Sequence, residues 1–179
     1  MNVDRIIETI PAKSPVERKA MRDNALRWLD GGTPEQKAQA ERLITALDAD
    51  EETSRQALYR RLKDMPLAER VVEAFRVAPP SDNERKAIQA LLDNPGATST
   101  VLSRAYGHDS MIWQMHFGNL CKDRQAHLWP AEKAENRDGR FFSGILAEYN
   151  SSTSGFTMRA ELIPAFVELG FDVPRATAP

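Results

Sequence analysis

The stretch 97–124 most constrains what this chain can fold into, because its pattern is that of two helices joined by a sharp turn. Thr98 is a good capping residue for a short helix, Ser99–Tyr106, which carries apolar residues on one side. Gly107 follows where that helix must end, because glycine readily takes the positive φ of a helix C-terminus. A second capped, apolar helix comes next, and this succession predicts a helix-turn-helix over residues 98–128.

The second helix is expected from about Met111 to Leu128, with Asp109 or Ser110 as its N-terminal cap. At about 100° per residue its apolar residues gather on one side, which we expect to pack against the core. Arg124 joins that side and is expected to bury its aliphatic stem while its guanidinium reaches water. The residues expected to face the core are Trp113, Phe117, Leu120, Cys121 and Leu128.

The opposite side of this second helix is the one that enters the DNA major groove in a helix-turn-helix. Serine, glutamine, asparagine and lysine suit base edges and phosphates, whereas methionines fit a contact with another protein better. Both kinds of partner therefore stay open at this point. The side carries Met111, Met115, Gly118, Asn119 and Lys122, with Ser110 and Gln114 near its start.

The composition restricts the class of protein. A chain of 179 residues with 41% hydrophobic and 28% charged residues is typical of a soluble globular protein. No apolar run approaches the roughly 20 residues needed to span a bilayer, and nothing suggests export, so we expect a cytoplasmic protein without a membrane partner. A net charge of −2 argues against a generic polyanion binder, and DNA binding would require a local basic patch.

The first 80 residues are expected to form a wholly helical module for assembly or dimerisation, residues 1–80. Ser14–Glu17 has the form of a capping box with proline at its first helical position, which predicts a helix to about residue 30. Thr33–Gln36 repeats this opening and predicts a helix to about Leu47. An acidic connector over 48–53 and two further helices, 54–62 and 66–77, are then expected.

Pro79 and Pro80 mark the expected boundary, because consecutive prolines cannot occupy a helix interior. The second domain is therefore expected over 81–179. A capped helix at Asn83–Asp93 precedes the helix-turn-helix and completes a set of three helices.

Beyond the third helix, β-structure is expected. Residues 131–139 are charged and predict a loop, and Phe141–Tyr149 is the best strand candidate in the chain. Asn150–Gly155 has the composition of a turn, and a short returning strand closes a hairpin over 141–158. A last amphipathic helix is expected at Arg159–Leu169.

A resemblance to the winged helix-turn-helix repressors, and to their ArsR-like metal-sensing branch, extends over roughly residues 83–158. Leu102-Ser103-x-x-x-Gly107 and Met111-Ile112-Trp113-x-x-His116-Phe117-x-x-Leu120 carry it, and Gly139-Arg140-Phe141 resembles the entry into the wing. The segment 129–139 is long for the join between recognition helix and wing in that family. By count, the chain from residue 81 onward has 10 basic and 12 acidic side chains, whereas winged helices that bind DNA are commonly basic.

The resemblance implies a mostly α protein, in which the N-terminal helical module is followed by a winged-helix domain with one small β-hairpin. It implies a regulator of transcription that binds double-stranded DNA, and we expect a homodimer formed through its helices. The alternative is a winged-helix or helical protein–protein interaction module without DNA binding. The residues expected to contact DNA are Thr98, Ser99, Arg104, Ser110, Gln114, Asn119, Lys122, Arg137 and Arg140.

The sequence does not favour a metal site or a catalytic site. His116 and His127 are eleven residues apart, which is about 16 Å along one straight helix, too far to share a zinc ion. Cys121 is expected to face the core, where a thiol is inert. The sequence also lacks a glycine-rich phosphate loop. We therefore expect no metal, no cofactor and no enzymatic activity.

Overall fold

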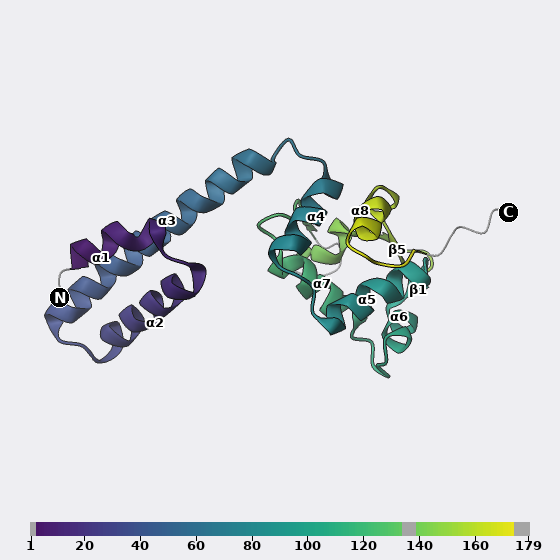
Figure 1. Ribbon diagram of the computed structural model, residues 1–179. Helices are drawn as coiled ribbons and strands as arrows, with labels where there is room; N and C mark the ends of the chain where they lie inside the picture. Colours follow the sequence, from purple (N-terminus) through teal and green to yellow (C-terminus); the bar gives the residue numbers. More distant parts are fainter. Residues whose placement is uncertain (1–2, 134–138, 174–179) are drawn as a thin grey trace. The chain divides into compact units, whose positions relative to one another are not determined.

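The computed structural model describes residues 3–133 and 139–173, which are mostly helical with small antiparallel sheets, as expected (Figure 1). The chain divides into two compact units, residues 1–60 and 61–179. The division therefore falls earlier than the expected boundary at residue 80. The reason is that α4 (Leu67–Val77) buries Val71 and Phe75 in the core of the second unit.

The first unit contains α1 (Val3–Thr9), the 3-10 turn η1 (Ile10–Ala12), α2 (Pro15–Gly31) and most of α3 (Pro34–Leu62). The capping box expected at the start of α2 is confirmed. Ser14 N donates to Glu17 Oε2 at 2.8 Å, and Glu17 N donates to Ser14 Oγ at 3.3 Å. The core of this unit consists of Val3, Ile10, Ala25, Ala40, Leu43 and Leu47.

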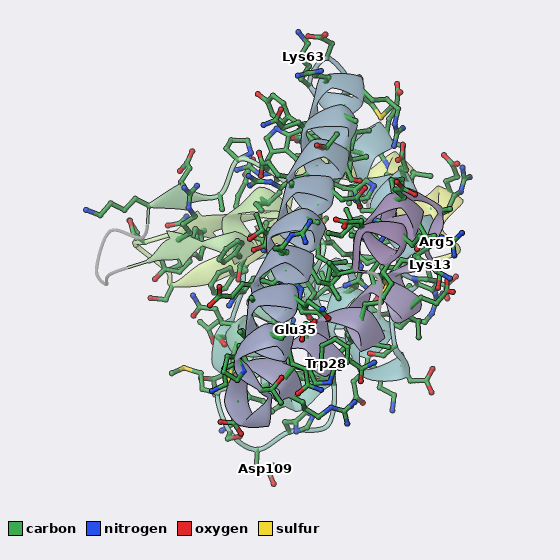
Figure 2. The ribbon with its side chains drawn as sticks, turned by 90° about the vertical axis from the view of Figure 1, so that its left-hand side faces the viewer. Arg5, Lys13, Trp28, Glu35, Lys63 and Asp109 are labelled. Carbon is green, nitrogen blue, oxygen red and sulfur yellow. The ribbon has the colours of Figure 1, made fainter. Side chains whose placement is uncertain are left out.

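The acidic connector expected over 48–53 was wrong, because α3 is one continuous helix of 29 residues (Figure 2). Neither glycine nor proline interrupts it after Pro34. The charges that suggested a loop lie on helix faces and pair with α2: Asp48 lies 2.6 Å from Arg22, and Asp50 lies 2.6 Å from Arg18. Sequence composition alone could not distinguish a solvated helix face from a connector.

In the second unit, α4 is followed by α5 (Asp82–Asp93), β1 (Ala97–Thr98), α6 (Ser99–Ala105) and α7 (Trp113–Asp123). The helix break at Pro79–Pro80 is present, and a capping box of Ser81 and Glu84 opens α5. The chain then continues through β2 (Glu132–Lys133), β3 (Arg140–Phe141), η2 (Phe142–Ile145), β4 (Ala147–Asn150), β5 (Gly155–Met158), η3 (Ala160–Leu162) and α8 (Ile163–Glu168).

A β-hairpin follows the third of the helices α5, α6 and α7, as expected, but it is shorter than the range 141–158. Its strands are β4 and β5, and β1 pairs antiparallel with β5 to give the order β1-β5-β4. The single strand expected over Phe141–Tyr149 was wrong, because Phe142–Ile145 forms the 3-10 turn η2. The loop expected over 131–139 was also incorrect in part, because its first residues contain β2, which pairs with β3.

Gly155 explains how β1 joins this sheet. A Cβ atom on Gly155 would lie 2.2 Å from the carbonyl oxygen of Gly96, so only glycine allows the two backbones to approach this closely. Gly96 N in turn donates to Phe156 O at 2.7 Å. The contact connects the segment just before α6 to the hairpin.

The core of the second unit surrounds Trp113. Its ring stacks on Phe117 with centroids 4.6 Å apart and packs against Phe156 at 5.0 Å. On the other side of the core, Phe75 of α4 meets Phe166 of α8 edge to face at 5.9 Å. Among the helices of the described residues, none is long and apolar enough to cross a membrane.

Candidate nucleic-acid interface

The cap of α6 and the glycine that follows this helix are confirmed. Thr98 is the N-cap of α6, and its Oγ1 accepts a hydrogen bond from Val101 N at 3.4 Å. Gly107 has a φ of +94°, in the left-handed region that favours glycine. Both signals are local, so they could be read from neighbouring residues.

The start of α7 differs from the expectation. The helix begins at Trp113 rather than Met111, and neither Asp109 nor Ser110 caps it. Asp109 projects away from the ribbon (Figure 2). The caps come from α6 instead: Ser103 Oγ accepts from Ile112 N at 3.1 Å and from Trp113 N at 2.9 Å.

A second hydroxyl of α6 completes this arrangement. Ser99 Oγ accepts from Gln114 N at 3.3 Å, and Ser103 Oγ donates to Ser99 O at 2.7 Å. Both serines are buried. The N–H groups of Trp113 and Gln114 at the start of α7, and that of Ile112 just before it, therefore find partners on α6, which sets the position of the second helix relative to the first.

Replacing Ser103 with alanine is expected to destabilise the second unit by about 1–3 kcal/mol, because the buried Trp113 N–H loses its acceptor, whereas Ile112 N keeps its hydrogen bond to Ser110 O. Urea unfolding followed by circular dichroism measures the change. Ser110→Ala is the matched control, since Ser110 is exposed and caps nothing, and it should stay within about 0.5 kcal/mol of the wild type. Equal losses from both substitutions would contradict the capping role of Ser103.

The inward side of α7 agrees with the expectation. Trp113, Phe117, Leu120, Cys121 and Leu128 are all buried, although the helix ends at Asp123 and Leu128 belongs to the following turn. Burial raises the pKa of the Cys121 thiol well above its ordinary range. The thiol is therefore a poor nucleophile at neutral pH.

Arg124 does not behave as expected, because its guanidinium is buried instead of reaching water. It pairs with Glu84 at 2.8 Å and donates to the carbonyl oxygens of Ala78, Pro79 and Leu120. It also lies 4.6 Å from the centroid of the Phe75 ring. Arg124 thus links α7 to α5 and to the break after α4, which is a structural role.

Fewer residues on the outward side of α7 are exposed than the sequence suggested. Gly118, expected on the open side, faces η2: a Cβ added there would lie 3.3 Å from Ser143 Oγ. Gln114 is half-buried, and its carbonyl oxygen accepts from the same hydroxyl at 3.4 Å. The residues left open, which we call the outer strip, are Met111, Met115, Asn119 and Lys122.

The remaining residues expected to contact DNA have different environments. Arg104 on α6 and Ser110 in the turn are exposed, whereas Thr98 is half-buried and Ser99 is buried with its hydroxyl engaged by α7. Arg140 on β3 is exposed and donates to Ala131 O at 3.2 Å. Arg137 lies outside the described residues.

Sequence reasoning missed a cluster of three aromatic rings at the turn. Tyr106 Oη lies 2.7 Å from His116 Nδ1, and the His108 ring lies 4.5 Å from the Tyr106 ring. Burial raises the pKa of Tyr106 above its usual range, which keeps its hydroxyl protonated as a hydrogen-bonding group. The residues come from both sides of Gly107, so helical spacing could not bring them together.

Metal binding finds no support in the described part of the chain, where no three histidine, cysteine, aspartate or glutamate side chains are grouped to hold an ion. His127 lies apart from the other histidines and its Nε2 is 3.3 Å from Glu73 Oε1. Glu73 also pairs with Arg61, whose hydrogen bond is the largest influence that lowers the pKa of the Glu73 carboxyl.

Comparisons of this chain with protein-family models, with curated proteins and with solved structures find no match.

Proposed function

We propose that the second unit is a winged-helix domain that binds double-stranded DNA and regulates transcription in the cytoplasm. The observation that carries the proposal is the order α5-β1-α6-α7-β4-β5, with β1 paired to β5 in a sheet of order β1-β5-β4. This is the element order of a winged helix, in which α7 is the recognition helix and β4–β5 is the wing. The outer strip of α7 is the part left open for a groove.

Individual residues of this face suit particular contacts. The amide of Asn119 can pair with the edge of adenine in the major groove, while Lys122 and Arg104 suit phosphates. The half-buried Gln114 lies in the first turn of the same helix, and Ser110 lies in the turn that precedes it. The turn of the wing is uncharged, because residues 150–154 are asparagine, serine and threonine.

Binding to duplex DNA is expected to be weak. The chain has a net charge of −2, and Asp123 follows Lys122 directly, so attraction is confined to the few cations of this face. Affinity for duplex DNA should therefore fall quickly above physiological salt.

The exposed methionines of the outer strip favour a second function, which is binding to protein. Met111 is 69% exposed and Met115 is 57% exposed, although both are large apolar side chains, and Val101 on α6 is 46% exposed. Flexible methionines at a surface suit a contact with protein, either another chain or a second copy of this one. In that case the outer strip would be a protein-binding or homodimer surface.

Substitutions at Lys122 and Met115 distinguish the two functions. If the strip binds DNA, Lys122→Ala should lower the slope of log affinity against log salt by about one unit, because one phosphate contact is lost. Fluorescence anisotropy with a random duplex over a salt series measures this slope. If the strip binds protein, Lys122→Ala should be nearly silent, and Met115→Glu should abolish association by placing a charge in an apolar contact.

Lys86→Ala is the control in this series, since Lys86 is an exposed cation on α5 and does not belong to the strip. Its slope should match that of the wild type. Tight association with a protein that salt does not weaken, together with no binding to any duplex, would refute the DNA-binding proposal. Sedimentation analysis of the wild type and of Met115→Glu then decides whether the partner is a second copy.

A further inference from the structure

The hairpin β2–β3 carries Arg140, one of the residues expected to contact DNA, but it belongs to neither the outer strip nor the β4–β5 wing. It lies in the segment between α7 and the wing that is longer than a winged helix needs. Its register places Lys133 directly opposite Arg140, and both side chains are exposed. The two cations come from separate strands, so only the pairing of β2 with β3 brings them together.

This pairing is electrostatically unfavourable by itself. Residues directly opposite in an antiparallel pair project from the same face, with their Cβ atoms about 4.5–5.5 Å apart, and like charges there repel. The acidic neighbour on β2, Glu132, lies opposite Phe141. Because successive side chains of a strand alternate between faces, the Glu132 carboxylate projects from the other face. Lys133 and Arg140 therefore share one face of the hairpin, and the Glu132 carboxylate is not on that face.

The base of the hairpin is held in a defined position. Arg140 Nη1 donates to Ala131 O at 3.2 Å, so part of the guanidinium is anchored to the backbone. The next residue, Phe141, packs edge to face against Tyr149 of β4 with ring centroids 6.2 Å apart, and it meets Phe156 of β5 at 6.4 Å. These contacts fix β3 against the wing.

We propose that Lys133 and Arg140 form a clamp for a phosphodiester group of DNA, separate from the outer strip of α7. An anion between two cations converts their repulsion into attraction, and the planar guanidinium binds phosphate oxygens with more than one donor. Lys133 and Arg140 then extend the protein's contact along the DNA backbone. This inference rests on the proposed DNA-binding function.

The test uses the full chain and the double variant Lys133→Gln/Arg140→Gln. Anisotropy titrations with one random duplex over a salt series give the slope of log affinity against log salt. Removing two phosphate contacts should lower that slope by about two units and weaken binding to every sequence alike. Arg140→Lys keeps the charge and should keep the slope.

A matched control removes two exposed cations elsewhere in the second unit, in the variant Lys63→Gln/Lys86→Gln. Its slope should equal that of the wild type. A slope of Lys133→Gln/Arg140→Gln equal to the wild type overturns the clamp while leaving the proposed function intact, and so does an equal fall in the control. Absence of any duplex binding by the wild type, even at low salt, overturns both.

Discussion

Replacing Trp113 with alanine is expected to destabilise the second unit by about 3–5 kcal/mol, the range seen when a large buried aromatic is truncated. The indole is fully buried, and its Nε1 donates to Ala87 O at 2.9 Å across to α5. Alanine would leave a cavity between Phe117 and Phe156 and a buried carbonyl oxygen without its donor. Since typical domains are stable by about 5–15 kcal/mol, the variant should be close to unfolding.

Urea unfolding of the whole chain, followed by circular dichroism, measures this loss. Met111→Ala is the control on the same helix-turn-helix, because Met111 is 69% exposed and its truncation should cost no more than about 0.5 kcal/mol. Trp113→Phe should fall between the two, since it keeps an aromatic ring but loses the hydrogen bond to Ala87. Similar losses from Trp113→Ala and Met111→Ala would mean that α7 has no open side, which contradicts the proposed function.

Removing the guanidinium of Arg124 is the second large effect. Arg124→Ala should cost about 3–5 kcal/mol, because it leaves the partly buried Glu84 carboxylate without its counter-charge. The carbonyl oxygens of Ala78 and Pro79 would also lose a donor. The double variant Arg124→Met/Glu84→Gln should recover part of this stability, since it removes both charges together. Failure of the double variant to recover any stability would show that the pair contributes through packing alone.

The same pair predicts how the loss depends on pH. Burial raises the pKa of Glu84, but hydrogen bonds from Arg124 and from the Ser81 backbone outweigh it and hold the pKa below its usual range. A carboxyl with a lowered folded pKa contributes stability above its unfolded pKa, about 4.3, and this contribution is lost as pH falls through the folded value. The gap in stability between wild type and Arg124→Ala should therefore be full at neutral pH and shrink below about pH 4. A gap that stays constant into acid would contradict this account.

Local signals were the reliable part of the prediction from sequence. The capping boxes at Ser14 and Ser81, the cap at Thr98 and the positive φ of Gly107 were all readable, because each depends on residues within one helical turn. The buried side of α7 was also predicted, since helical periodicity indicates which residues share a face.

The predictions from sequence were incomplete or wrong where the contacts of a segment involve residues distant in the sequence. In residues 48–53 the run of charges suggested a connector, but Asp48 and Asp50 pair with arginines of α2, and no pattern within the segment shows this pairing. The strands β2 and β3 have two residues each and are defined only by pairing with one another, so the sequence, which predicted Arg140 as a DNA contact, did not show that Lys133 lies opposite it.

By itself, then, the sequence determined the helical class, the three helices before the hairpin and the buried side of α7, because caps, glycines and periodicity act over a few residues. Only the tertiary structure decided which neighbouring element packs against each of the other parts of α7. The 3-10 turn η2 packs against Gly118, so this residue is not part of the outer strip. Ser103 of α6 caps the start of α7. Glu84 forms an ion pair with the Arg124 guanidinium, which is therefore buried. Helical periodicity gives the direction of a side chain, but the neighbour it meets depends on how segments distant in the sequence pack together.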